Sequence, residues 1–137
     1  MKYIIIIFCY AFTQFTAHSV EIDYQLEFGL VLKDTNGEAI GFKKTTAIPI
    51  DTAGENSLYG IVISKDSEEN FTVGSVHILP KEHKEINKIM GKVMVINGKG
   101  AVFMKTQSND IPGDYAIEVY INGILFKTIE YKLLATT

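Results

Sequence analysis

The sequence lacks several residue types that particular classes of protein depend on. Among its 137 residues there is no arginine, no tryptophan and one cysteine, and only three are proline. A formal net charge of -3 argues against a dedicated nucleic-acid binder, which would carry a basic excess. A single cysteine excludes a disulfide framework and a structural zinc site. The remaining composition, 47% hydrophobic and 21% charged, is that of one ordinary globular domain.

The first twenty residues have the pattern of a targeting segment. Lys2 precedes an apolar stretch over residues 3–12, which is too short to span a hydrocarbon core of about 30 Å. Ala17 and Ser19 then form a small-x-small cleavage site. We therefore expect residues 1–19 to be a signal peptide, residues 20–137 to be the single exported domain, and no stable membrane anchor to remain after cleavage. The alternative is a buried N-terminal strand or helix.

Residues 20–33 alternate between apolar and polar side chains almost without interruption. Period two predicts a half-buried strand, because successive side chains in a strand point to opposite faces. Gly29 interrupts this long strand and predicts a bulge or bend. Pro49 lies in a second strand and predicts a sheet edge or a strand switch, because it cannot donate a ladder hydrogen bond.

Four further patterns predict the middle of the chain. Residues 58–64 alternate as a strand, and residues 71–79 do so with a slip at Gly74 and Ser75 that indicates a β-bulge. Residues 80–91 show helical spacing between Pro80 and Gly91, which predicts a short helical crossover. The continuous apolar run 93–96 is typical of a central strand.

The clearest local pattern is a hairpin around Asn122 and Gly123. This pair is preferred in type I′ turns, because both central residues need a positive φ. A two-residue loop would place Ile121 opposite Ile124, Val119 opposite Phe126 and Glu118 opposite Lys127.

The order of these elements predicts an all-β fold, an antiparallel immunoglobulin-like β-sandwich of about seven to eight strands with one short helical crossover. Gly113 and Tyr115 stand near the start of the second-to-last strand, where such domains carry a tyrosine corner. Ile117 would then occupy the position of the core cysteine. The alternative is an ordinary turn followed by a core tyrosine.

Short segments of turn and core residues resemble a family of small exported bacterial domains of unknown function. The segments are Glu27-Phe28-Gly29-Leu30, Tyr59-Gly60-Ile61, Pro112-Gly113-Asp114-Tyr115 and Val119-Tyr120-Ile121-Asn122-Gly123. The resemblance covers about residues 24–133 and implies an immunoglobulin-like sandwich. The family has no known catalytic residues, so the resemblance implies no site residue.

No catalytic motif is present, and we expect no enzyme activity, no cofactor and no metal. Ser75 lacks the glycine spacing of a nucleophile elbow. His77, His83 and Glu85 are conceivable zinc ligands, but their spacing favours solvated side chains. The charged turn at residues 66–70 offers oxygens from Asp66, Glu68, Glu69 and Asn70 to calcium without the spacing of a calcium loop, so a plain charged turn is the alternative.

These observations predict a non-enzymatic exported interaction module that binds a protein partner. The candidate contacts are the loops at residues 51–57, 66–70 and 106–112, or the edge strand that carries Pro49. The alternative function is a small-ligand or metal-binding periplasmic protein with a pocket between the sheets. A purely structural role also remains open.

Overall fold

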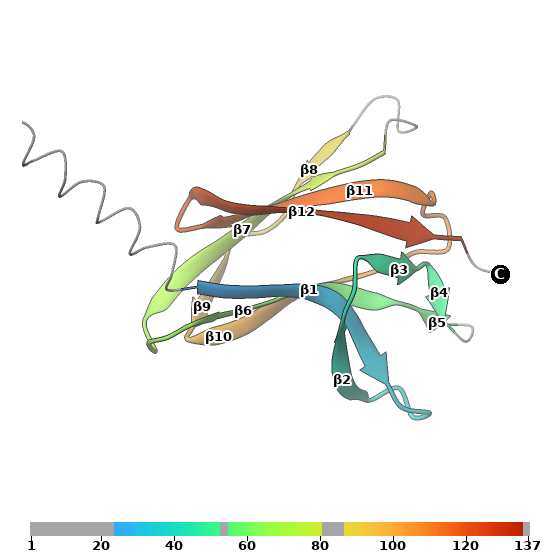
Figure 1. Ribbon diagram of the computed structural model, residues 1–137, viewed down its shortest axis with the longest axis horizontal. Helices are drawn as coiled ribbons and strands as arrows, with labels where there is room; N and C mark the ends of the chain where they lie inside the picture. The colour runs from blue at the N-terminus through green and yellow to red at the C-terminus, as the bar shows by residue number, and fades with distance from the viewer. Residues whose placement is uncertain (1–23, 53–54, 81–86, 136–137) are drawn as a thin grey trace, which may run out of the picture.

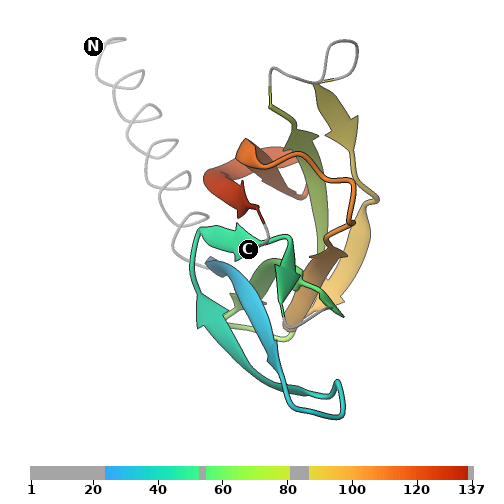
Figure 2. The same cartoon turned by 90° about the vertical axis from the view of Figure 1, so that its right-hand side faces the viewer.

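The computed structural model describes residues 24–52, 55–80 and 87–135, and within them the chain forms two packed sheets (Figure 1). Viewed from the end, the two sheets form separate layers (Figure 2). The expected signal peptide lies outside the described residues. No helix in the described part of the chain is long and apolar enough to cross a membrane.

One layer is a four-stranded antiparallel sheet. Its order is β10 (Lys99–Lys105), β6 (Leu58–Lys65), β1 (Tyr24–Lys33) and β2 (Ala39–Lys44).

The other layer is a six-stranded sheet. Its order is β3 (Ala47–Pro49), β12 (Ile124–Leu134), β11 (Gly113–Ile121), β7 (Asn70–Ile78) and β8 (Lys88–Met90), and β9 (Met94–Asn97) also pairs with β7. A small hairpin of β4 (Asp51–Thr52) and β5 (Glu55–Asn56) completes the set. The strand number therefore exceeds the seven to eight expected, because short edge strands such as β3, β4 and β5 leave little period-two signal.

The space between the sheets is filled by apolar side chains from both layers. Aromatic rings contribute much of the contact, since Phe28 lies 4.9 Å from Tyr131 and Tyr24 lies 5.1 Å from Phe71, measured between ring centroids. The hydroxyls of Tyr59 and Tyr131 lie 3.4 Å apart within this core. Burial raises the pKa of both phenols above the ordinary value of 10.0, so they stay neutral.

The structure confirms the alternation in β1 from Tyr24 to Leu30, but the prediction is wrong beyond it, because Val31 is buried and Leu32 is exposed. There is also no bulge at Gly29. Gly29 pairs in continuous register with Gly60 on one side and Lys44 on the other. A Cβ atom at Gly29 would clash with the carbonyl oxygen of Lys43, so this glycine permits a close approach of β2. The register shift falls later, between Leu32 and Lys33.

Pro49 lies both at an edge and at a strand switch, as predicted. Its strand, β3, is the last strand of the six-stranded sheet and runs parallel to β12. The preceding strand, β2, belongs to the four-stranded sheet, so the chain crosses between the layers just before Ala47.

The bulge predicted at Gly74 and Ser75 is wrong for β7. Phe71, Val73 and Ser75 are all buried, and the pairing of β7 with β11 runs through without a shift. The irregularity lies in the segment that pairs with β7. Between β8 and β9, the three residues 91–93 face only two residues of β7, Gly74 and Ser75. Ser75 thus points inward, although its polar side chain led the hydrophobicity pattern to predict an outward position.

The predicted helix over residues 80–91 and the predicted central strand over 93–96 are both corrected. The described residues contain no helix, and Lys88–Met90 forms strand β8; residues 81–86 lie outside the described residues. β9 pairs only with β7, so it is an edge strand in the described structure. Backbone pairing with β7, rather than local helical spacing, decides the conformation of this segment.

The hairpin turn is confirmed, with φ of 51° at Asn122 and 80° at Gly123. Ile121 pairs with Ile124 as expected, but Val119 then pairs with Lys127 and Glu118 with Thr128. The register shift has a physical reason, because the Phe126 ring reaches Tyr24 in the core. Ile129, Tyr131 and Leu133 are buried at positions of the other parity, so one extra residue is needed for both sets to face inward.

The tyrosine corner is confirmed at the start of β11. The Tyr115 hydroxyl donates to the carbonyl oxygen of Ile111 at 2.7 Å. Ile117, two residues further on, is fully buried between the sheets.

Candidate functional site

One side of the sandwich ends in three strands that each have a single neighbour among the described residues. β8 and β9 pair only with β7, and β10 pairs only with β6. We call residues 88–105, which include these strands, the open edge. Its backbone offers unpaired hydrogen-bonding groups in both sheets, as any edge strand does.

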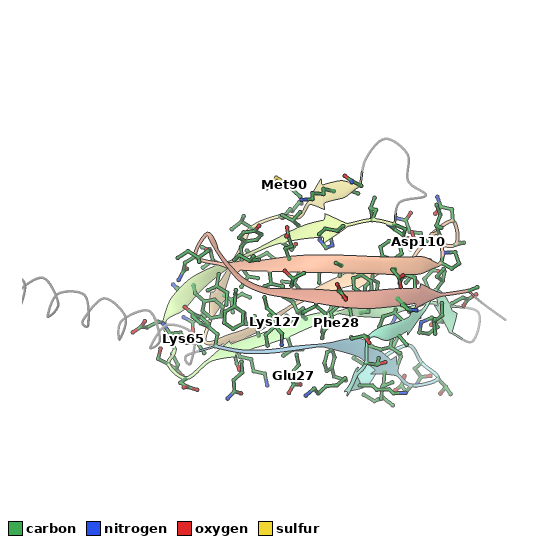
Figure 3. The ribbon with its side chains drawn as sticks, turned by 45° about the horizontal axis from the view of Figure 1, so that its top comes forward. Glu27, Phe28, Lys65, Met90, Asp110 and Lys127 are labelled. Atoms are coloured by element: carbon green, nitrogen blue, oxygen red, sulfur yellow. The ribbon has the colours of Figure 1, made fainter. Side chains whose placement is uncertain are left out.

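The open edge also collects exposed hydrophobic side chains. Six of the eleven large hydrophobic side chains that are exposed in the described structure lie in this segment: Ile89, Met90, Val93, Met94, Val95 and Phe103. Met90, which is 80% exposed, projects away from the body of the sandwich (Figure 3). Single exposed apolar residues are ordinary, whereas several in one short segment are typical of a contact surface.

The inner face of this edge passes from exposed to buried along the chain. Directly paired residues share a face of a sheet, and Ile96 and Met94 pair with the buried residues Phe71 and Val73. Ile96 is buried, yet Met94 is 42% exposed. Ile89 pairs with His77 on the same face and is also exposed. The six-stranded sheet therefore extends past the four-stranded sheet here.

The charge of the open edge has one sign. Lys88, Lys92, Lys99 and Lys105 lie in it, and the sequence from Asn87 to Asn109 contains no aspartate or glutamate. The ion pairs of the described residues are Lys65–Glu69 and Lys132–Asp114, so none of these four lysines has a carboxylate partner there. In a chain with net charge -3, this segment is locally basic.

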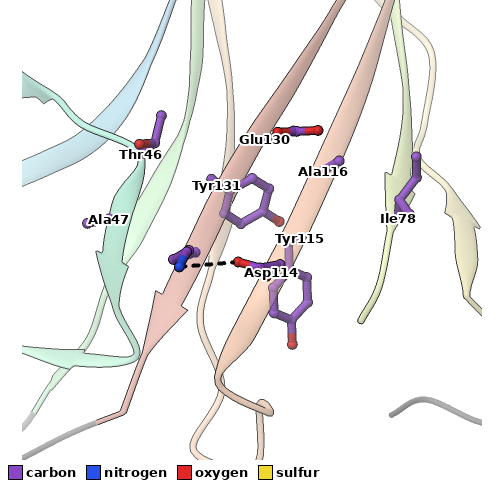
Figure 4. A pocket seen from close by; sticks show the side chains of 9 residues that line it. Thr46, Ala47, Ile78, Asp114, Tyr115, Ala116, Glu130 and Tyr131 are labelled. Atoms are coloured by element: carbon purple, nitrogen blue, oxygen red, sulfur yellow. Dashed lines mark ion pairs between the residues drawn. The ribbon is translucent and has the colours of Figure 1, made fainter. Parts of the chain in front are cut away.

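A hollow of about 510 Å³ lies on the outer face of the six-stranded sheet (Figure 4). Ala116 and Ile78 line it together with Glu130, and Asp114 and Lys132 form an ion pair of 3.6 Å at its margin. Both of these charged side chains are mostly exposed. The hollow is therefore shallow and solvated, and it is not a pocket between the sheets.

The candidate metal ligands do not come together in the described residues. His77 contacts Ser75, with 3.0 Å between Nε2 and Oγ, and burial lowers the pKa of its imidazole below 6.5. His83 and Glu85 lie outside the described residues. In the charged turn, Glu69 pairs with Lys65 at 2.9 Å. Within the part of the chain that the structure describes, no group of three or more such side chains is placed to hold a metal ion.

The loops predicted as contact sites are tied to the body by their own hydrogen bonds. Residues 51–57 contain the β4–β5 hairpin, and the buried Thr106 hydroxyl accepts from the Ser57 amide and donates to the Ile50 carbonyl oxygen. In residues 106–112, the Gln107 amide donates to the Asp110 carboxylate at 2.8 Å. Among the described residues of the three predicted loops, no large hydrophobic side chain is exposed.

Sequence reasoning missed the open edge because it assigned these residues to a helix and to a central strand. A usable signal was present: a 23-residue segment with four lysines and no acidic residue surrounds the apolar run 93–96. A central strand of a sandwich is covered on both sides and has no need of flanking lysines, whereas an edge strand does.

No protein-family model and no curated protein matches this chain. Among solved structures, an immunoglobulin-like protein from Pseudomonas aeruginosa is similar over 80% of this chain and 92% of its own, with 12% identity and a TM-score of 0.51. Weaker similarities, with TM-scores of 0.42 and 0.44, involve 30% of an alkylpurine DNA glycosylase from Pseudomonas fluorescens and 16% of a β-glucosidase from Listeria innocua. They cover 81% and 83% of this chain at 11% and 10% identity. The first similarity concerns the fold alone: the chain is an all-β two-sheet sandwich with an immunoglobulin-like neighbour.

Proposed function

We propose that this protein is a non-enzymatic interaction module that binds a protein partner through the open edge. The observation that carries the proposal is the gathering of exposed Met90, Val93 and Val95 beside unpaired strand backbone. Edge strands recognise extended segments of other proteins through main-chain hydrogen bonds, and neighbouring side chains supply specificity. We place this binding outside the cytoplasm, since the N-terminal pattern is that of an export signal.

The resemblance to small exported bacterial domains of unknown function remains part of this proposal. It agrees with an exported sandwich that carries no catalytic site. The shared turn and core residues support a common scaffold, and none of the four quoted segments lies in the open edge.

The main alternative, a periplasmic binder of a small ligand or metal, has less support. The hollow on the outer face is shallow, and its charged groups at Asp114 and Lys132 pair with each other. A small-ligand site more often encloses its ligand and directs a few convergent polar groups at it.

Site-specific photo-crosslinking in the organism of origin tests the proposal. A photoreactive residue replaces Met90 or Phe103 in the open edge, and the matched control replaces Ile40, which is exposed on the opposite edge strand β2. We expect a discrete crosslinked partner from the open-edge positions and none from Ile40. Crosslinks from all three positions alike, or from none, would contradict the proposal.

A further inference from the structure

We propose that the open edge takes up an extended segment with an acidic side chain at each end and apolar side chains facing inward between them, which adds as a fifth strand beside β10. This inference rests on the proposed function and names the chemistry of the partner. Four observations support it: the extent of the two sheets, the free edge of β10, the charge of that edge and the spacing of its lysines.

The two sheets leave room for one more strand beside β10. Met94 and Ile89 lie on the inner face of the six-stranded sheet, yet both are exposed, from which we infer that the opposite layer does not cover them. Neighbouring strands lie about 4.8 Å apart and packed sheets about 10 Å apart. A strand added to β10 would therefore place its inward side chains opposite Met94 and Ile89.

β10 is a better template for a new strand than β8 or β9. It pairs with β6 without interruption from Lys99 to Lys105, whereas β8 and β9 are separated by the irregular residues 91–93. Val102 and Met104 are only partly buried against the core, so their outer sides are open to inward side chains of an added strand.

The outer face of β10 is bordered by positive charge. Val102 pairs with the fully buried Ile61, so Val102 points inward and Lys99, Ala101, Phe103 and Lys105 point outward. Phe103 is 40% exposed, and its ring lies 6.2 Å from Phe42. This contact with β2 means that the Phe103 ring leans across the outer face of the sheet, away from the free edge of β10. The outward side chains of an added strand would thus meet a lysine at each end.

This spacing defines the segment that fits. Lys99 and Lys105 are six residues apart, which is about 20 Å along a strand. The matching segment carries carboxylates at its first and seventh positions and apolar side chains at the even positions that face inward. Opposite charges on neighbouring strands favour this pairing, and like charges oppose it.

A designed peptide pair tests the assignment with the purified protein. The probe has glutamate at both ends of seven residues with alternating valine and threonine between, and the control has lysine at both ends of the same sequence. We expect the acidic peptide to bind and to slow hydrogen exchange at the amides of residues 99–105. Charge contact alone would bind without protecting these amides, and that result would overturn strand addition.

Charge reversal tests the role of the two lysines. The variant Lys99→Glu/Lys105→Glu is expected to lower the affinity for the acidic peptide by about tenfold and to raise the affinity for the lysine peptide. The matched control Lys43→Glu/Lys44→Glu changes two exposed lysines on the opposite edge strand β2 and should leave both affinities unchanged. If charge reversal destabilises the fold, Lys99→Gln/Lys105→Gln is used in its place. This variant should show the same loss of affinity for the acidic peptide and no gain of affinity for the lysine peptide.

The same variants also test two other partners for the open edge, an anionic membrane and a second copy of this chain. Binding to phosphatidylglycerol vesicles that Lys99→Glu/Lys105→Glu abolishes, without binding of the peptide, would assign the edge to an anionic membrane and overturn the inference. Concentration-dependent dimerisation that protects residues 99–105 would assign it to a second copy and also overturn it. If a partner crosslinks at Phe103 but no acidic peptide binds, the inference fails and the proposed function stands; if neither occurs, both fail.

Discussion

The hydroxyl of Tyr115 donates to the carbonyl oxygen of Ile111, four residues earlier, and this bond fixes the chain as it enters β11. The Tyr115 ring also stacks on Tyr131, with 5.6 Å between centroids, so the corner is anchored in the core. One side chain therefore connects the loop before β11 to the packing between the sheets.

Removing this hydroxyl should lower the stability of the fold. We expect Tyr115→Phe to reduce the free energy of unfolding by about 1 kcal/mol, because the Ile111 carbonyl loses a partner while the ring packing remains. Tyr120→Phe is the matched control, since Tyr120 faces outward on the same strand and its hydroxyl forms no hydrogen bond among the described residues. Urea unfolding of both variants decides the matter; equal stability losses would contradict a special role for the corner.

Asn122 should stabilise the last hairpin through both its side chain and its backbone conformation. Its side-chain oxygen accepts from the Thr72 amide at 3.0 Å, and its φ is 51°. Asn122→Gly keeps the backbone conformation but loses the side-chain bond, with an expected cost of about 1 kcal/mol. Asn122→Ala should cost about 1 kcal/mol more, because alanine also opposes a left-handed conformation. Thermal unfolding that ranks alanine equal to or above glycine would contradict this account.

The turns and the corner could be predicted because their chemistry is local. Asp34 illustrates this, since its side chain accepts from the amides of Asn36 and Glu38 within a single turn. Asn122 and Gly123 likewise need only their own φ angles. Period two was equally informative in the first part of β1, because one face of that strand packs on the core, but it failed at Val31 and Leu32.

Pairing between distant segments could not be predicted in the same way. Phe126 shifts the register of the hairpin because its ring finds Tyr24, which is 102 residues away in the chain. The open edge was missed for the related reason that an apolar run such as residues 93–96 looks the same whether one strand or two strands flank it. The neighbours of a strand depend on the order of the whole sheet, and that order cannot be derived from the sequence of the strand itself.

Thr106 should be essential for the end of the sandwich that carries β4 and β5. It is fully buried, and its hydroxyl joins Ser57 to Ile50. Thr106→Val keeps the shape of the side chain but removes both interactions, so we expect a loss of about 2 kcal/mol in unfolding free energy. Thr128→Val, an exposed change on β12, should cost less than about 0.5 kcal/mol. A neutral Thr106→Val would show that this end is held by packing alone.

The proposed export signal at residues 1–19 predicts a defined N-terminus. Mass spectrometry of protein recovered from outside the cytoplasm should show a chain that starts at or near Val20, because Ala17 and Ser19 form the cleavage site. Replacing Ala17 with a bulky residue should slow this processing. Uncleaved protein found only in the cytoplasm would contradict the export hypothesis.

His77 should make stability fall in mild acid. Burial lowers its pKa below 6.5 in the folded state, whereas the unfolded chain takes up a proton near the ordinary value. The folded state therefore binds fewer protons, and its stability is retained above pH 6.5 and lost as the pH falls toward the lower folded pKa. Urea unfolding at about pH 7.5 and about pH 5.5 measures this loss, and His77→Gln should reduce it, because glutamine can still accept from Ser75 but does not titrate. Carboxylates contribute equally to both proteins, so the difference between them isolates His77. An identical loss in the variant would mean that the imidazole is solvated enough to titrate normally.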